Sequence, residues 1–515
     1  MDTRVPKTHP PAIRSTERRV WTRVGSIGGG LLAAIALTYI LPALGVLRPW
    51  SPGDSYVPFW NIIGREFLGE GKALEEEARQ LEKLNTQAKM PEASLAPKKA
   101  AAQQVPSDPV FPEYTSPQKV EKPKWGIEPP QALEAYYRKL TLVDLGVKGA
   151  IARTGHWGDS ILGVDGITSN IRNRLQARFG DAGHGFHLIS RYNPSYRQQG
   201  IFFEGSSGWD RCLVAFECRK KDHRYGYGGL TANTSGSVMG RWETTKEGFG
   251  EKASRFEIWY AKQENGGNLI ITTDGKRKEV VSTRGPHLED GWHEVRVPAG
   301  QHKFTLQVSG GNVRAYGIVM ENDGPGVVWD GIAHISGSTR GIRTQDEEHI
   351  KSQIKHRDVD LIVFMYGGND MQRGYVDLKE SMQPYYDEYA EVIRKYTAGK
   401  PGLPCLIMSV TDHGKRNQWE AIESVKFGKV LADAQREVAK RTGCGFFDTY
   451  EATGGVGTAA RWYKANPRLL SPDLGHPNGL GHQLIAGLVT NALLYGYEEY
   501  RSKMVGAPFP ELEAK

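Results

Sequence analysis

The sequence predicts an α/β protein whose parallel sheet is interrupted by an all-β region and preceded by a membrane-spanning segment. Residues 130–192 and 326–500 alternate short apolar strands with amphipathic helices, which is typical of a parallel sheet covered by helices. Residues 193–325 contain short strands separated by Gly, Asn or Asp turns, as in a β-sandwich or jelly roll. Residues 24–47 carry no charged side chain. We therefore expect one α/β domain in two pieces, with a β domain inserted between them.

The composition is that of a folded protein without a nucleic-acid-binding surface. Of the 515 residues, 39% are apolar and 24% are charged, so the chain can bury a core. The formal charge is +7, but residues 1–23 carry six basic and two acidic side chains, which leaves +3 for the rest of the chain. Nucleic-acid binders usually concentrate basic charge on a folded domain, so we exclude that class.

The N-terminal part of the chain predicts an anchor followed by a tether. The apolar stretch 24–47 is long enough to span a bilayer, and the basic residues 1–23 before it predict a cytoplasmic tail with the remainder outside. A cleaved signal peptide is the alternative. Residues 48–129 are expected to form a short juxtamembrane helix and a linker, because residues 91–130 contain nine of the 28 prolines. Residues 501–515 are expected to form a short tail.

The four cysteines predict neither a zinc site nor a disulfide scaffold, since no CxxC or Cys/His spacing is present. Cys212 and Cys218 are expected on one strand, too far apart to bond unless the chain bends back between them. Cys405 and Cys444 each begin an apolar run. We expect buried free thiols.

The two α/β pieces can be assigned element by element. The first contains a strand that begins near residue 150 and ends at Gly158-Asp159-Ser160, and a helix over 166–180 whose apolar residues share one face. The second contains the apolar strand 359–366, a helix over 378–396, the strand 405–410, a helix over 421–443, a strand from residue 445 and a last helix from residue 479. A strand that is apolar on both faces is typical of a buried parallel sheet.

Polar residues that could take part in catalysis lie where these strands end. Ser160 follows the first strand, Asn369 follows the strand 359–366, and Asp473 and His476 lie in the loop before the last helix. Because the carboxyl ends of parallel strands form one edge of a sheet, we expect these residues to converge there. Taken singly, each motif is most often only a turn or a cap. Their order along the chain is what favours a site.

Together these residues fit acyl transfer. A serine hydroxyl is a weak nucleophile until a base takes its proton, and His476 is the candidate base for Ser160. Asp473 can accept the Nδ1–H of His476 and orient the ring. The oxyanion needs preorganised donors, for which we expect the N–H of Ser160, the side-chain amide of Asn369 and a glycine N–H after residue 329.

This set of residues resembles the SGNH, or GDSL-type, hydrolases. Their four marks are a Ser in Gly-Asp-Ser, a Gly, an Asn in Gly-x-Asn-Asp and a His in Asp-x-x-His, which Ser160, Asn369, Asp473 and His476 match. The glycine mark is matched only loosely by WDGIAHISGSTRG, where Gly337 is the candidate oxyanion donor and Ser336 and Gly341 are alternatives. The resemblance implies a three-layer α/β/α sandwich with a five-stranded parallel sheet.

A narrower resemblance is to the bacterial cell-envelope branch of that family. The segments RLQARFGDAGHGFHLI, GIVMENDGPGVVWDG and FFDTYEATGGVGTAARWYK, together with the β insertion, are similar to peptidoglycan O-acetylesterases with an inserted carbohydrate-binding-like jelly roll. This implies a chain in the bacterial inner membrane with a periplasmic catalytic domain. It also implies no cofactor and no metal, although His482 lies six residues after His476.

We therefore expect a serine esterase that removes acetyl groups from a cell-wall or envelope polysaccharide. Two alternatives stay open at this point. One is a polysaccharide O-acetyltransferase that uses the same residues, and the other is a non-enzymatic glycan-binding scaffold. The aromatic residues of the insertion could form a glycan platform, but in a β-sandwich they more often belong to the core; they are Trp209, Tyr225, Tyr227, Trp242, Trp259 and Trp292.

Overall fold

The computed structural model describes residues 25–26, 28–30, 32–33, 35–41, 109–117, 120–205, 207–216, 218, 220–377 and 379–512. The chain divides into two compact units, residues 1–80 and 81–515. In the first unit, the described residues between 25 and 40 are helical. Among all described residues, no helix is both long enough and apolar enough to cross a membrane. The other positions of the predicted anchor 24–47, the basic tail 1–23 and the predicted juxtamembrane helix lie outside the described residues.

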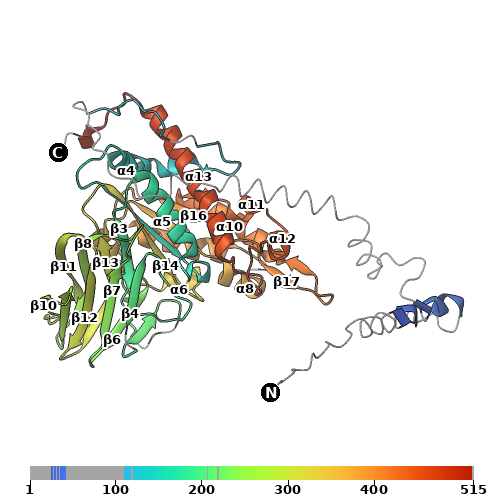
Figure 1. Cartoon of the computed structure of the whole chain (residues 1–515), viewed down its shortest axis with the longest axis horizontal. Coiled ribbons are helices and arrows are strands. Elements are labelled where there is room, and N and C mark those ends of the chain that lie inside the picture. The colour runs from blue at the N-terminus through green and yellow to red at the C-terminus, as the bar shows by residue number, and fades with distance from the viewer. Residues whose placement is uncertain are drawn as a thin grey trace, which may run out of the picture. The chain divides into compact units, whose positions relative to one another are not determined.

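The second unit contains the parallel sheet that the sequence predicts (Figure 1). Its strand order is β1-β19-β16-β15-β2-β14, and all neighbours except β1 and β19 are parallel. The five parallel strands confirm the expected number, and β1 adds a short antiparallel edge. The bounds are β1 Ile127–Glu128, β2 Ile151–Gly158, β14 Gly326–Ala333, β15 Leu361–Met365, β16 Cys405–Met408 and β19 Gly445–Phe447.

Helices cover both faces of this sheet, as two residues of β2 demonstrate. The Thr154 hydroxyl donates to the hydroxyl of Tyr136 in α4, whereas Trp157 packs edge-on against Tyr396 of α9. Residues three apart on a strand point to opposite faces, so α4 and α9 lie on opposite sides. The helices are α4 Glu134–Asp144, α5 Gly166–Phe179, α6 Thr339–Arg343, α7 Glu347–Arg357, α8 Gly368–Asp377, α9 Gln383–Thr397, α10 Lys426–Thr442, α11 Thr449–Ala452, α12 Thr458–Lys464 and α13 Gly479–Met504.

A β region separates β2 from β14 in sequence, although these two strands are neighbours in the sheet. It consists of two antiparallel sheets, with strand orders β10-β9-β12-β7-β4 and β11-β8-β13-β6-β5, and β3 pairs with β13 at the second. The bounds are β3 Gly183–Leu188, β4 Ile201–Gly205, β5 Asp210–Leu213, β6 Leu230–Thr234, β7 Met239–Thr244, β8 Ala253–Lys262, β9 Asn268–Thr273, β10 Arg277–Ser282, β11 Glu289–Gly300, β12 Lys303–Ser309 and β13 Val313–Glu321.

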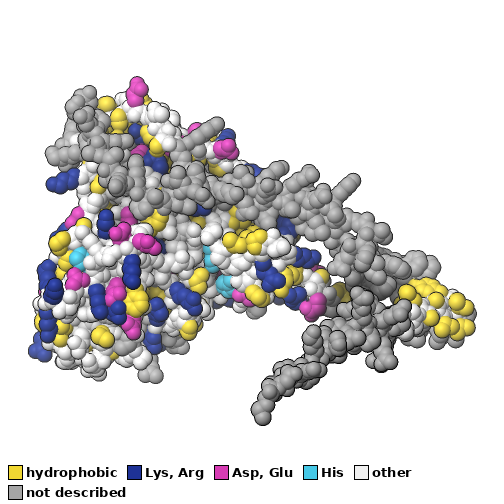
Figure 2. Space-filling view, viewed as in Figure 1, with side chains coloured by type: hydrophobic (Ala, Val, Ile, Leu, Met, Phe, Trp, Pro, Cys, Tyr) yellow, Lys and Arg dark blue, Asp and Glu magenta, His cyan; other side chains and the backbone are white. Residues whose placement is uncertain are grey.

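The two sheets of the β region pack against each other through aromatic rings. Phe256 of β8 stacks on Phe304 of β12 with 4.2 Å between ring centroids. Of the six aromatic residues considered as a glycan platform, all but Trp292 are buried, which confirms the core interpretation for those five. On the outside, Figure 2 shows basic and acidic side chains interspersed over this region with small hydrophobic areas between them.

Buried ion pairs join the β region to the parallel sheet. Glu321 at the end of β13 accepts hydrogen bonds from Arg153 of β2, Arg255 of β8 and Arg357 of α7. Arg357 also donates to both carboxylate oxygens of Asp330 in β14, each at 2.9 Å. These five residues, which we call the junction network, connect both parts of the molecule. Glu321, Asp330 and Arg357 are buried, whereas Arg153 and Arg255 are partly exposed.

The expectation of free thiols is wrong. Cys212 is bonded to Cys218, and Cys405 is bonded to Cys444. The chain turns directly after β5 and brings Cys218 back to Cys212, with their Cα atoms 5.4 Å apart. Cys405 begins β16 and Cys444 directly precedes β19, and these strands are parallel neighbours, so the two Cα atoms lie 4.7 Å apart.

Several elements were not anticipated from the sequence. Among them are the edge strand β1, the strand β14 and a hairpin formed by β17 (Gly414–Arg416) and β18 (Ile422–Ser424). The hairpin occupies the beginning of the segment that was expected to be helical over 421–443, so α10 begins only at Lys426. Short 3₁₀ helices precede α4 (Pro130–Leu133), follow β2 (Ser160–Leu162) and follow α13 (Pro510–Leu512).

Candidate active site

The loop that carries Ser160 is held in a tight turn at the end of β2. Ser160 is the first residue of the short 3₁₀ helix, two residues after the last strand residue Gly158. The Asp159 carboxylate accepts the N–H of Ile161 at 3.0 Å, which closes an Asx-type turn around the serine. Asp159 therefore stabilises the loop.

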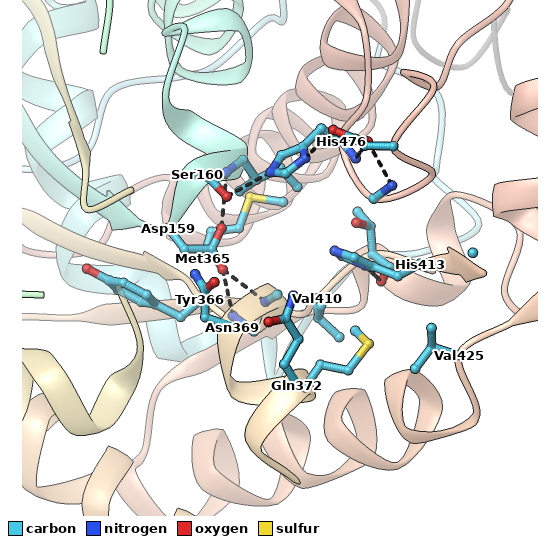
Figure 3. A pocket seen from close by; sticks show the side chains of 18 residues that line it. Asp159, Ser160, Met365, Tyr366, Asn369, Gln372, Val410, His413, Val425 and His476 are labelled. Carbon is cyan, nitrogen blue, oxygen red and sulfur yellow. Dashed lines mark hydrogen bonds and ion pairs between the residues drawn. The ribbon is translucent and has the colours of Figure 1, made fainter. Parts of the chain in front are cut away.

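Ser160, His476 and Asp473 form a continuous hydrogen-bonded chain (Figure 3). The Nδ1 atom of His476 lies 2.9 Å from Oδ2 of Asp473, and its Nε2 atom lies 2.7 Å from Oγ of Ser160. A carboxylate can only accept, so Nδ1 carries the proton and Nε2 presents its lone pair to the serine hydroxyl. This is the geometry in which an imidazole can take the serine proton.

The carboxylate of Asp473 is fixed by its own loop. Its Oδ1 atom accepts the N–H groups of Gly475 and His476, both at 3.0 Å. Burial alone would raise the pKa of Asp473, but these two N–H groups and the imidazole outweigh it, so the pKa lies below its ordinary value. The residue therefore stays ionised at neutral pH and can stabilise a protonated His476.

Asn369 and Gly337 are also brought together. Asn369 contributes a side-chain donor, whereas Gly337 contributes a carbonyl acceptor. The side-chain amide of Asn369 lines the cavity and donates to the carbonyl oxygen of Gly337 at 2.9 Å. The N–H of Gly337 donates to the carbonyl oxygen of His334 at 2.6 Å. Gly337 thus contacts the site through its carbonyl oxygen, and its role as an N–H donor stays a prediction.

Two loops of the site are tied to each other by Asp159. Its Oδ2 atom accepts the N–H groups of Gly367 and Gly368, at 3.1 and 2.9 Å, directly before Asn369. The neighbouring Asp370 accepts the N–H and the hydroxyl of Thr339 in α6, and burial raises its pKa to about 6. These contacts fix the start of α8 and hence the position of the Asn369 side chain.

A cavity of about 500 Å³ opens beside Ser160. It is lined on one side by the residues already described and on the other by an apolar and amide surface, formed by Met365, Tyr366, Met371, Gln372, Val410 and Val425. An acetyl group alone would leave much of this volume empty, so there is room for part of the alcohol to which it is bonded.

His413 is a residue of this cavity that sequence reasoning missed. Figure 3 shows its ring pointing into the cavity between His476 and Asn369. Its Nδ1–H donates to the carbonyl oxygen of Thr411 at 3.0 Å, which leaves Nε2 as an acceptor. Burial lowers the pKa of His413, which favours the neutral ring. The signal was its place after the strand 405–410, at the same sheet edge as the other site residues.

Two further histidines lie near the site residues in the sequence, and both are buried in the fold. His156, before the nucleophile, is buried and accepts the indole N–H of Trp329 at 3.2 Å. His482 is buried at the start of α13, where its ring packs against Gly166. Neither residue lines the cavity.

The hydroxyl–imidazole–carboxylate chain lies at the carboxyl edge of the parallel sheet, an arrangement that fits the chemistry of a serine hydrolase. A comparison with protein families finds a match over part of the chain. Residues 311–484 match the GDSL-like lipase/acylhydrolase family, and this range contains Asn369, Asp473 and His476. A comparison with curated proteins finds no match.

Solved structures with this fold include a peptidoglycan O-acetylesterase, with 18% sequence identity and a TM-score of 0.59 over 71% of this chain and 96% of the other. A salicylyl-acyltransferase from a tetracycline biosynthetic pathway aligns at 13% identity and a TM-score of 0.25, over 59% and 95% of the two chains. An acetylxylan esterase from Geobacillus stearothermophilus aligns at 20% identity and a TM-score of 0.23, over 33% and 73%. Only the first of these alignments supports a detailed fold comparison.

Residues 311–484 are thus similar to GDSL-like hydrolases, and the fold of the chain resembles that of a peptidoglycan O-acetylesterase. As an enzyme it is a carboxylic ester hydrolase. The non-enzymatic scaffold that the sequence left open is thereby set aside.

Proposed function

We propose that this chain removes O-acetyl groups from a cell-envelope polysaccharide through a Ser160 acyl-enzyme. The observation that carries the proposal is the hydrogen-bonded chain from Asp473 through His476 to Ser160 at the mouth of the cavity. Ser160 Oγ attacks the acetyl carbonyl carbon while His476 Nε2 takes its proton. His476 then returns the proton to the sugar oxygen as the ester bond breaks.

The second half of the reaction regenerates the serine. Water attacks the acetyl-serine carbonyl, His476 takes a proton from that water, and acetate leaves as the proton returns to Ser160. The oxyanion of both tetrahedral intermediates is stabilised by the N–H of Ser160 and the amide of Asn369, with Gly337 as the expected third donor. No step needs a metal or an organic cofactor.

The polysaccharide substrate is inferred from three supports. The protein in the alignment with a TM-score of 0.59 is a peptidoglycan O-acetylesterase. That alignment covers 71% of this chain, which is more residues than the two α/β pieces contain. The cavity beyond Ser160 is larger than an acetyl group requires. The β region inserted between β2 and β14 fits a substrate that extends beyond one sugar.

We also propose that the enzyme is anchored in the bacterial inner membrane and acts in the periplasm. The supports are the uncharged stretch 24–47, the basic residues 1–23 before it, and two disulfides. Disulfides persist in oxidising compartments and are rare in the cytosol. Protease added to spheroplasts should digest residues beyond 47, and a protected catalytic domain would contradict this placement.

The test of function is acetate release by the full-length chain from O-acetylated peptidoglycan and from 4-nitrophenyl acetate. We expect turnover of both by the wild type and by Ser235→Ala, which removes an exposed hydroxyl from the β region. Ser160→Ala should abolish both. Persistent turnover in Ser160→Ala would disprove the mechanism.

The same assay separates hydrolysis from transfer. If acetate is not released but acetyl groups appear on an added unacetylated glycan, the chain is the O-acetyltransferase that the sequence left as an alternative. If only the small ester is cleaved, the serine chemistry stands and the polysaccharide assignment fails.

A further inference from the structure

The β17–β18 hairpin, residues 414–424, rises directly from the rim of the cavity. Its first residue, Gly414, and the residue directly after it, Val425, both line the cavity. The N–H of Gly414 donates to the carbonyl oxygen of Leu474, the residue after Asp473, at 2.8 Å. The N–H of Val425 donates to the backbone carbonyl oxygen of His413 at 2.7 Å. The hairpin is therefore anchored to the loop that carries the triad carboxylate.

Buried polar contacts also fix the base of the hairpin from behind. The Ser424 hydroxyl donates to Asp412 at 2.8 Å and accepts the N–H of Gly457 at 2.7 Å. The same carboxylate accepts the N–H of Ala459 at the start of α12 at 3.0 Å. With its base held on two sides, the hairpin projects as a defined element beside the cavity.

The tip of the hairpin is organised by two of its own side chains, and one of them, Arg416, donates to the carbonyl oxygen of Glu420 at 3.2 Å. The side-chain oxygen of Asn417 accepts the N–H groups of Trp419 and Ala421, at 2.9 and 3.1 Å, and its amide donates to Glu423 at 2.7 Å. Such an Asx arrangement fixes the turn without help from the rest of the protein. The backbone of Trp419 is thus positioned before any ligand arrives.

Trp419 has 54% of its surface exposed, whereas the tryptophans of the β region are buried or half-buried. On the same hairpin, the guanidinium of Arg416 lies over the ring of Tyr463 at 5.4 Å and donates to its hydroxyl at 3.3 Å. Arg468 covers the same ring at 4.1 Å. The hairpin therefore presents an exposed indole, which has an apolar body and a polar N–H, and a guanidinium, which has several hydrogen-bond donors.

We propose that Trp419 and Arg416 form an extended glycan subsite, which binds sugar units next to the one that carries the scissile ester. This inference rests on the proposed function. The indole offers a flat apolar face to a sugar ring, and the guanidinium offers donors to hydroxyl or carboxylate oxygens. Trp419 is five residues from Gly414, so it lies within about 18 Å of the rim. That reach corresponds to a few sugar units of a polymer, and a small ester cannot use it.

The charge of the hairpin favours a glycan over a membrane surface. Lys415 and Arg416 are balanced by Glu420 and Glu423, so the hairpin has no net charge to attract anionic lipid. Figure 2 shows hydrophobic, basic and acidic side chains mixed at the end of the molecule where Figure 1 places β17. Its direct continuity with the catalytic cavity also fits a substrate and not a bilayer.

The kinetic test compares a polymer with a small ester. Trp419→Ala should lower kcat/KM for O-acetylated peptidoglycan about fivefold to tenfold, mainly through KM, and should leave kcat/KM for 4-nitrophenyl acetate unchanged. Trp419→Phe should recover most of the loss because it restores an aromatic face. The control is Val505→Ala, which removes an exposed apolar side chain at the far end of α13. An equal loss on both substrates, or no loss on the polymer, would overturn the subsite.

A binding test keeps the subsite separate from the esterase activity. Ser160→Ala full-length chain, with and without Trp419→Ala, is sedimented with purified peptidoglycan sacculi and with phosphatidylglycerol vesicles. Sacculus binding that falls severalfold on loss of Trp419 supports the subsite even if no esterase activity is found. Sacculus binding that is independent of Trp419, or vesicle binding that depends on it, overturns the assignment to glycan.

Discussion

Charged side chains gather in two regions, the sheet edge that carries Ser160, His476 and Asp473, and the junction network. The two regions differ in their exposure to water. At the sheet edge, the side chains of His476 and Asp473 are 43% and 54% exposed. In the junction network, the side chains of Arg357 and Asp330 are 2% and 0% exposed. Charge that must change during a reaction remains in contact with water, and charge that only joins two parts of the fold is removed from it.

The pKa directions reflect this difference. Burial alone would raise the pKa of Glu321 in the junction network, but Arg357, Arg153 and Arg255 more than compensate, and its pKa is strongly lowered. The pKa of Asp473 is lowered chiefly by two backbone N–H groups of its own loop. The first carboxylate depends on distant parts of the chain and the second on neighbouring residues, so mutations in the two regions should have different consequences.

The largest expected effect is on activity at the sheet edge. Ser160→Ala should reduce kcat for a small acetyl ester by about 10⁴-fold or more, because the acyl-enzyme cannot form. The free energy of unfolding should change by less than about 1 kcal/mol, since a half-buried hydroxyl is replaced by a methyl group. A fluorophosphonate probe should label the wild type and leave the variant unlabelled. Labelling of the variant would show that another nucleophile reacts.

Asp473→Asn should reduce kcat by about 10³-fold, because the amide no longer holds Nδ1–H and cannot stabilise the imidazolium. The loss should be smaller than for Ser160→Ala, since this carboxylate is half exposed and water can partly replace it. The measurement is steady-state kinetics on 4-nitrophenyl acetate over a pH series. A variant as active as the wild type would remove Asp473 from the mechanism.

Glu321→Gln, in the junction network, should have the opposite effect: it should reduce stability and leave kcat nearly unchanged. It should lower the free energy of unfolding by about 3–5 kcal/mol, because three arginines lose the carboxylate that neutralises them in a buried site. In the fraction that stays folded, kcat for the small ester should be close to wild type. Chemical denaturation measures the first effect, and Glu348→Gln, at an exposed position, is the control. Loss of kcat without loss of stability would contradict the assignment of the junction network to stability and of the sheet edge to activity.

The smallest expected effect concerns His334, which lies between the two regions. It bridges the carbonyl oxygen of Gly228 and the hydroxyl of Tyr366, at 3.0 and 2.8 Å, and burial lowers its pKa to about 4. The unfolded chain takes up this proton near pH 6.5 and the folded chain only near pH 4, so stability is lost as pH falls through that window. The contribution is about 3 kcal/mol.

His334→Gln tests this pH dependence. The variant cannot titrate, so its free energy of unfolding should fall less between pH 6.5 and pH 4 than that of the wild type, even though it starts lower at pH 7. Urea denaturation at several pH values gives both slopes. Parallel slopes would mean that other buried histidines, such as His156, account for the acid sensitivity.

The sequence predicted which residues converge at the sheet edge, because Ser160 and Asn369 follow strands with a clear apolar pattern and His476 lies in the loop before the last helix. Ser160, Asn369 and His476 lie far apart in the chain, yet the parallel sheet brings the ends of their strands or loops to one edge. Local pattern and a general rule of parallel sheets were enough.

The parts that could not be predicted depend on contacts between distant segments. The disulfide of Cys405 and Cys444 follows from the pairing of β16 with β19, and no spacing of the two cysteines reveals that order. The strand β14 contains glycines at 326 and 331 and gives a weak strand signal, but it pairs with β2 along its full length. The β17–β18 hairpin was hidden by a helical pattern that extends too far back from α10.

The bridge from Asp159 to Gly367 and Gly368 has a consequence for how this enzyme could diversify. It makes the serine loop and the asparagine loop one rigid body, so neither can be reshaped without displacing the other. The hairpin 414–424 contributes only its base to the cavity, and its tip is held by Asn417 and Arg416, two residues of the hairpin itself. Natural variation, or directed evolution toward other acetylated polymers, therefore has a route that leaves the chemistry intact: lengthening or rewriting that hairpin.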